Sequence, residues 1–431
     1  MRSTSAIRRL RPLPRLGLLV FCLISIGVSG RQMLWYFSHG PTVTDLRIFM
    51  TGIDMVASGQ GRQLYHFDAQ QKAQIQLYPE TRTSGLLPFN HLAYELLFYW
   101  PVSKLPYRTA LLVWALANVA ILFLIARLLA PYSRALTQAT GTPLALYLLA
   151  FYPVMYVFGE GQDSLIFMLL VVLSLRSMDS GRTFLAGFLL ALACFKFHLA
   201  LLIAFFVLLL RGKWQFRRLA GFATGAALVG GISLALVGPA ILHDYPAMLR
   251  QQDVMTPWGF IPWFMPNLRG LLQWALAPRL DAGTILPVVF MSSAVVGVVA
   301  IWQTLRNRNS NNEENAKNIA KNINDESMAY AVAILTTILI SYHLHMQDLT
   351  MALLPIVVLA DRAIRMWQER RTTEKPNLWI ALLAVTIATL YLYRIAAEPF
   401  PVLLLRGCLL AVPVFVLWVV ALRWWSTPTP P

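Results

Sequence analysis

The sequence predicts an all-α polytopic membrane protein, and three observations predict that class. Of its 431 residues, 57% are hydrophobic and 13% are charged, whereas soluble domains carry about 25% charged residues. The apolar residues gather in runs of about 20, the length that a helix needs to cross a membrane. Lys and Arg gather in alternate connections between these runs, which is typical of a chain that crosses a membrane many times.

We expect about twelve membrane spans. Two neighbouring pairs, 183–196 with 197–211 and 327–345 with 347–366, could each form one kinked stretch. The first run could also be a cleaved signal peptide, but its apolar residues continue through Phe37, which favours a retained anchor. The twelve runs are 16–37, 108–130, 142–158, 163–178, 183–196, 197–211, 217–238, 283–305, 327–345, 347–366, 377–394 and 401–424.

The positive charges predict the orientation of these spans. With the N-terminus in the cytoplasm, 23 of the 36 Lys and Arg residues lie on the cytoplasmic side and 13 on the other. We therefore expect one transmembrane domain (1–431) in the plasma (inner) membrane, with both termini cytoplasmic, a basic N-terminus (1–15) and an Asn-rich flexible linker (306–326). Two long loops, 38–107 and 239–282, then lie on the periplasmic or extracellular face. The net charge of +16 is explained by orientation, so no nucleic-acid partner is predicted.

Polar side chains collect on the expected outer face. Six of the seven His residues lie there, and the seventh, His198, lies in a turn that faces the same side. Ionisable groups near membrane depth are costly, so their convergence on one face indicates a functional site. The candidates are Asp45, His91, Gln162, Asp163, Lys196, His198, Asn267, Arg269, His343, His345, Asp348 and Arg394.

Most of these candidates also have an ordinary structural explanation. Asp45 follows Thr44 and could serve only as an acid favoured by the dipole of a helix N-terminus. Lys196 and His198 could extend to the membrane interface. The others could be helix-end or loop charges, which applies to Glu160, Asp163, His91 and Arg269.

The sequence offers little for a metal or a disulfide. His343 and His345 lie two residues apart near Asp348, but no third nitrogen or sulfur ligand is close in the sequence. No metal or other cofactor is therefore predicted, although a divalent ion stays open. The three cysteines lie inside apolar runs without polar neighbours, which is typical of small buried side chains; they are Cys22, Cys194 and Cys408.

A set of ordered motifs resembles one known family. An acid after the first run is followed by a weakly amphipathic stretch, expected to lie at the membrane interface, and then by "LYHFDAQQ". Further segments follow in order: "LPFNHLAYELLFYWPVSKLPYRTALLVWALANV", "GEGQDSLIFMLLVVL", "CFKFHLALLIAFFVLLLRGKW", "MPNLRGLL" and "SYHLHMQDLTMALLP". Over residues 40–360 this order resembles glycosyltransferase family 87, whose members are membrane glycosyltransferases of the GT-C type.

The resemblance implies a GT-C-type bundle and an inverting transferase. Such an enzyme moves a hexose, most commonly mannose, from a polyprenyl-phosphate donor to a lipid or glycan acceptor at the outer leaflet. Asp45 is then the expected general base, because the acceptor hydroxyl must lose a proton. The departing phosphate needs positive charge, for which the candidates are Lys196 first, then His198, Arg269 and Arg394. The remaining polar candidates would read the sugar or the acceptor, namely Gln162, Asp163, His91, Asn267, His343, His345 and Asp348.

Two other interpretations compete with the transferase. Twelve spans also suit a secondary transporter or a flippase of a lipid-linked sugar, but transporters place polar groups at the membrane midplane and often show repeats. A non-catalytic scaffold for envelope assembly would tolerate single replacements of the outer-face residues. The transferase alone requires Asp45, Lys196 and the 343–348 turn to surround one cavity that opens sideways to the outer leaflet.

Overall fold

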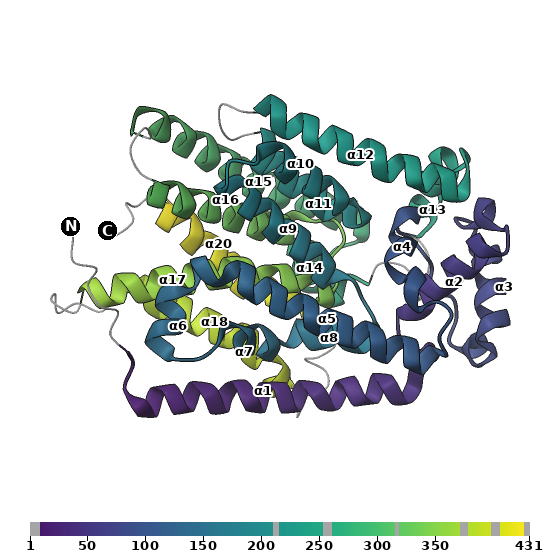
Figure 1. Cartoon of the computed structure of the whole chain (residues 1–431), viewed down its shortest axis with the longest axis horizontal. Coiled ribbons are helices and arrows are strands. Elements are labelled where there is room, and N and C mark those ends of the chain that lie inside the picture. Colours follow the sequence, from purple (N-terminus) through teal and green to yellow (C-terminus); the bar gives the residue numbers. More distant parts are fainter. Residues whose placement is uncertain are drawn as a thin grey trace.

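The computed structural model describes residues 9–209, 215–252, 261–314, 319–370, 378–397 and 406–425. In these ranges the regular secondary structure is helical, and no strand occurs. Long helices run side by side as a bundle, and short helices cover one of its ends (Figure 1). The first long helix begins, and the last one ends, at the opposite end of the bundle. The expected all-α class is confirmed.

Thirteen of the labelled helices build the bundle, some of them short. They are α1 (Pro12–His39), α5 (Tyr107–Leu129), α7 (Leu144–Ala150), α8 (Tyr152–Glu160), α9 (Ser164–Asp179), α10 (Thr183–Leu192), α11 (Phe197–Ala204), α12 (Gln215–Val237), α15 (Ala282–Glu314), α16 (Ile319–Ile340), α17 (Leu353–Arg370), α18 (Leu378–Ala397) and α20 (Ala411–Trp425). Two further short helices, α6 (Arg134–Thr140) and α14 (Leu268–Leu276), pack against them.

Fewer helices than expected are long and apolar enough to cross a membrane. In the described residues five segments meet that condition, and a bent pair, Thr183–Leu192 with Cys194–Leu208, makes a sixth if it is one span. The two halves of this pair meet at an angle of 59°. The expected twelve spans are therefore not confirmed. The five segments are Pro12–Ala57, Tyr107–Tyr132, Phe216–Val237, Ala282–Asn307 and Gly407–Trp425.

Breaks in the helices account for the difference. The apolar run 142–158 forms two short helices, α7 and α8, which separate at Phe151, two residues before Pro153. Proline lacks the N–H that would bond to the preceding turn, so a continuous helix is disfavoured there.

Residues 306–326 were expected to be a flexible linker, but α15 continues to Glu314 and α16 begins at Ile319.

The segment after α1 folds into a compact cap. We define the cap as residues 40–106 together with α13 (Ile241–Gln252); its other helices are α2 (Leu46–Ala57), α3 (Phe67–Leu77) and α4 (Leu96–Tyr99). It has a hydrophobic core of its own, which extends to Val237 at the end of α12. Figure 1 shows these helices gathered at one end of the bundle.

Helix α2 lies inside this cap. Nine of its twelve residues are buried, so the interfacial helix expected from its amphipathic pattern is instead a core element. The fully buried Arg47 explains how: its guanidinium donates to the carbonyls of Pro41 (2.9 Å) and Gly85 (3.0 Å) and to the hydroxyl of Ser84 (3.0 Å). These hydrogen bonds hold the segment around Ser84 and Gly85 against α2.

Candidate functional site

A cavity of about 790 Å³ lies between the cap and the bundle. Its wall combines α2, α8, α13, the turn after α10 and the segment that follows α16. Most of the predicted site residues line it, although they come from distant parts of the sequence. These residues are Asp45, His91, Gln162, Lys196, His198, His343, His345 and Asp348.

Asp45 directs its carboxylate toward Gln162 and not toward its own helix. It occupies the N-cap position of α2, but its side chain makes no capping hydrogen bond. Instead, Oδ2 accepts a hydrogen bond from Nε2 of Gln162 at 2.5 Å. The N-cap position suits an acid because of the helix dipole, but the carboxylate is bonded to the turn at Gln162 and not to its own helix.

The turn that carries Gln162 is held by α5. The carbonyl of Gln162 accepts hydrogen bonds from Nε1 of Trp114 (3.0 Å) and Nδ2 of Asn118 (3.2 Å). The ring of Trp114 stacks on Tyr99 with centroids 4.0 Å apart, and Tyr99 stacks in turn on Phe49 of α2. The helix that begins at Asp45 and the turn that carries Gln162 are thus both fixed to the same aromatic stack.

Gly161 allows α2 to approach this turn closely. Its φ of 71° lies in the left-handed region that favours glycine, and its carbonyl accepts a hydrogen bond from the hydroxyl of Tyr99 at 3.1 Å. A Cβ atom on Gly161 would lie 2.8 Å from Cβ of Leu46. Any larger residue would therefore push the start of α2 away from Gln162.

Lys196 forms a buried ion-pair network in the wall of the cavity. Its Nζ lies 2.7 Å from Oδ1 of Asp348 and 3.3 Å from Oδ1 of Asp163. Asp348 also accepts hydrogen bonds from the hydroxyl of Ser164 (3.1 Å) and the backbone N–H of His345 (3.0 Å). Burial by itself would raise the pKa of the Asp348 carboxyl, but the Lys196 ammonium holds that pKa well below its usual range.

Histidines line the cavity as neutral groups. Burial lowers the pKa of His91 to about 4 and also lowers the pKa of His343 and of His345. The rings of His343 and His345 lie 4.2 Å apart, and those of His198 and His343 lie 5.8 Å apart. Neutral imidazoles can donate or accept hydrogen bonds to a sugar hydroxyl.

Two predicted residues, Asn267 and Arg269, do not line the cavity, and Asp163 lies behind its wall. Asn267 caps α14 and donates from Nδ2 to the carbonyl of Ser341 at 2.7 Å. Arg269 donates to the carbonyl of Tyr342 at 3.1 Å and lies over its ring. Both residues hold the segment that carries His343. The side chain of Arg394 lies outside the described residues.

Sequence reasoning missed one acidic residue and undervalued another. Glu95 is fully buried, and its Oε2 lies 2.6 Å from Nδ1 of His91. Burial raises its pKa to about 7. Glu160, explained above as a helix-end charge, lines the cavity and accepts a hydrogen bond from the Tyr36 hydroxyl at 3.2 Å. The signal for Glu95 was a lone acid in the apolar segment "AYELLFYW".

The helical bundle and this cavity, whose mainly apolar surface carries several charged and polar side chains, are those of a membrane protein with an internal site for a ligand. The sequence model of glycosyltransferase family 87 matches residues 95–341, which is more than half of the chain. The chain therefore belongs to glycosyltransferase family 87 and is a membrane glycosyltransferase. No curated protein and no solved structure gives a significant match to it. The matched segment includes Gln162 and Lys196, whereas Asp45 and Asp348 lie outside it.

Proposed function

We propose that this glycosyltransferase moves a hexose, mannose being the first candidate, from a polyprenyl-phosphate donor to a lipid or glycan acceptor on the outer face of the plasma membrane. The family supports transfer of a sugar, and the cavity supports a site for one. The donor, the kind of sugar and the outer face follow from the resemblance described above. One observation carries it: a partly exposed carboxylate, Asp45, meets a cavity large enough for a sugar. Pockets of 300–1,000 Å³ are typical of small-molecule sites.

Asp45 is the general base. Within the described residues its carboxylate accepts one hydrogen bond, from the amide of Gln162, and no Lys or Arg forms an ion pair with it. Its second oxygen is therefore available to take the proton of an acceptor hydroxyl. Asp348 is less suited, because Lys196, Ser164 and His345 already occupy its oxygens.

The transfer exchanges one bond of the anomeric carbon for another. As the acceptor oxygen bonds to that carbon, its proton passes to Asp45, and the carbon–oxygen bond to the lipid phosphate breaks. The electron pair leaves with polyprenyl phosphate, and attack from the opposite face inverts the anomeric centre. Lys196 supplies positive charge near the departing phosphate, with His198, Arg269 and Arg394 as further candidates.

The other polar groups of the cavity would orient the sugar. Gln162, His345 and His343 each reach the cavity surface, and their amide or imidazole groups suit the hydroxyls of a hexose. Asp348, His91, Asp163 and Asn267 would support them, the last two from behind the wall. Holding reactants in the reactive geometry supplies a large part of catalysis when no covalent intermediate forms.

The test uses purified protein in lipid nanodiscs. Short-chain polyprenyl-phosphate mannose and a total lipid extract of the source cells are added, and release of polyprenyl phosphate and formation of mannosylated product are followed. We expect turnover by the native protein and a loss of about 1,000-fold or more in Asp45→Asn, since general-base catalysis contributes about 10²–10⁴-fold. Asp54→Asn, an exposed acid of the same helix, is the matched control and should keep full activity.

Other outcomes would change the proposal in defined ways. Full activity of Asp45→Asn would move the base to Glu160 or Asp348. Bound donor without turnover would point to another sugar or acceptor. Movement of the donor across the membrane without any product would replace the transferase by a flippase of a lipid-linked sugar.

A further inference from the structure

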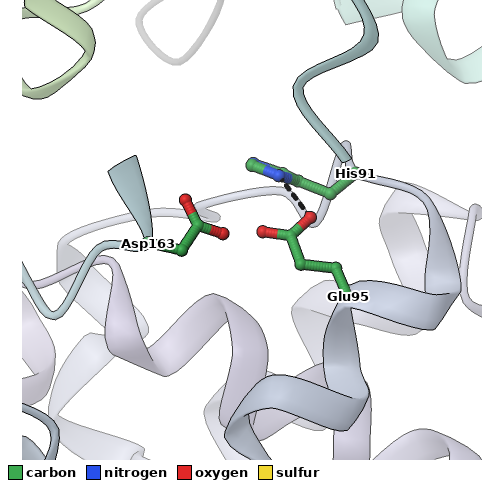
Figure 2. Close-up of side chains that lie close together, drawn as sticks. All are labelled: His91, Glu95 and Asp163. Atoms are coloured by element: carbon green, nitrogen blue, oxygen red, sulfur yellow. Dashed lines mark ion pairs between the residues drawn. The ribbon is translucent and has the colours of Figure 1, made fainter. Parts of the chain in front are cut away.

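Behind the cavity wall, three side chains of ligand type meet. Figure 2 shows His91 and Glu95, from one stretch of the cap, facing Asp163 at the start of α9. One ligand atom from each of them lies within 4.8 Å of the other two. Glu95 and Asp163 are fully buried, whereas His91 reaches the cavity.

The carboxylates of this cluster lack the hydrogen bonds that buried charges need. Neither oxygen of Glu95 and neither oxygen of Asp163 has a hydrogen-bond partner of acceptable geometry. An uncompensated buried charge is strongly unfavourable, and two facing carboxylates repel one another. The charge of the cluster is therefore offset either by a proton shared between the two carboxyls or by a cation.

Lys196 offsets this charge only in part. Its Nζ is closer to Asp348 (2.7 Å) than to Asp163 (3.3 Å). Within the residues that the structure describes, no Lys or Arg forms an ion pair with Glu95. Its Oε2 instead lies 2.6 Å from Nδ1 of His91.

We propose that His91, Glu95 and Asp163 bind a divalent first-row metal ion. Two carboxylate oxygens and one imidazole nitrogen form a mixed donor set, which suits Mn²⁺ or Zn²⁺ better than Ca²⁺. Ligands at about 2.1 Å from a common ion lie no more than about 4.2 Å apart. Small side-chain rotations bring the three groups into that range, and water can fill the remaining positions.

The ion would also prepare the cavity for an anion, a role that rests on the proposed function. Three acids, Asp45, Glu160 and Asp348, and two cations, Lys196 and Arg250, line the cavity. The buried carboxylates of Glu95 and Asp163 behind the wall add negative charge close to Lys196 and so disfavour an entering lipid phosphate. A divalent cation behind His91 would offset these two carboxylates and so favour the phosphate without taking part in the bond exchange.

Metal binding is tested without any donor or acceptor. The native protein in nanodiscs is stripped with a chelator, which is then removed, and Mn²⁺ binding is followed by electron paramagnetic resonance and calorimetry. We expect one bound Mn²⁺ per chain, and at least tenfold weaker binding in Glu95→Gln and in Asp163→Asn. The exposed acids of the cap give the matched controls Glu80→Gln and Asp68→Asn, which should bind as the native protein does.

A thermal scan separates loss of the site from loss of folding. Mn²⁺ should raise the melting temperature of the native protein and of Glu80→Gln, because a ligand that binds only the folded state stabilises it. A metal-free Glu95→Gln protein that melts as high as the native apoprotein, but does not respond to Mn²⁺, would support the site. An unchanged Mn²⁺ response in Glu95→Gln, or no binding by the native protein, would overturn it in favour of a proton shared between the two carboxyls.

These results are independent of the transferase proposal. Sugar transfer by the metal-stripped protein would show that the ion is not needed for transfer and would leave the proposed function in place. Bound Mn²⁺ without transfer would support the metal site and argue against the proposed function. Loss of donor binding on metal removal, restored by Mn²⁺, would support the role of the ion in preparing the cavity.

Discussion

Gln162 donates a 2.5 Å hydrogen bond to the carboxylate of Asp45, across 117 positions of the sequence. Because α5 fixes the backbone of Gln162, the amide holds one oxygen of Asp45 in place at the wall of the cavity, which both residues line. The position of the proposed base therefore depends on a residue that performs no chemistry itself.

Replacing Gln162 by Ala should lower kcat by about 10- to 100-fold, since a displacement of about 1 Å at a reactive group costs about that much. Steady-state rates with the polyprenyl-phosphate sugar measure the effect. Gln63→Ala, an exposed glutamine of the cap, is the control. A change in KM alone would show that Gln162 binds the sugar and does not position Asp45.

Gly161→Ala should impair both stability and activity. The left-handed backbone costs an alanine about 1 kcal/mol, and overlap with Leu46 adds about 1–3 kcal/mol. Gly181 separates the two effects, because its φ is also 71° but a Cβ there meets nothing within 4 Å. Unfolding in detergent and transfer rates should show a small loss for Gly181→Ala and a larger loss, with reduced turnover, for Gly161→Ala. Equal losses would contradict the close approach of α2.

Lys196→Met should destabilise the fold by about 3–5 kcal/mol, because it leaves buried carboxylates without their ammonium. Resistance to unfolding by detergent measures the loss. The exposed Lys104→Met should change stability by no more than about 0.5 kcal/mol. Adding Asp348→Leu to Lys196→Met should recover part of the loss, and a double variant that is less stable than Lys196→Met would argue against the pair.

Asp348 should make stability depend on pH in the acidic range. Its pKa is lower in the folded protein than in the unfolded chain, so the stabilisation is complete above about pH 4, the usual pKa of Asp. It is lost as the pH falls through the folded value. The difference in melting temperature between the native protein and Asp348→Asn should therefore shrink below about pH 4. A constant difference between about pH 3 and pH 6 would show that Asp348 is not ionised in the fold.

Much of the site could be predicted from the sequence. Costly polar residues in an apolar chain indicated where function lies, and ordered motifs indicated the family. Asp45, Lys196, His345 and Asp348 do surround one cavity, while their individual roles stay predictions. Glu95 was missed although it is a lone acid in an apolar segment, because its meeting with Asp163 depends on how the cap folds against the start of α9.

The helical class was also predictable, but the number of spans was not. Apolar runs show which segments avoid water, yet a run such as 142–158 does not show where a helix breaks. Burial of α2 could not be read from its pattern either, since an amphipathic helix suits a protein core as well as a membrane surface. Both features depend on contacts between residues far apart in the sequence.

The composition of the cavity wall also sets the order of events in biosynthesis. Tyr393 completes a wall that begins with Gln32, so a chain emerging from the ribosome has no complete wall until about nine-tenths of it has been made. The ammonium of Lys196 lacks its nearest carboxylate until Asp348 has been added. The cavity therefore forms only after almost all of the bundle has been synthesised.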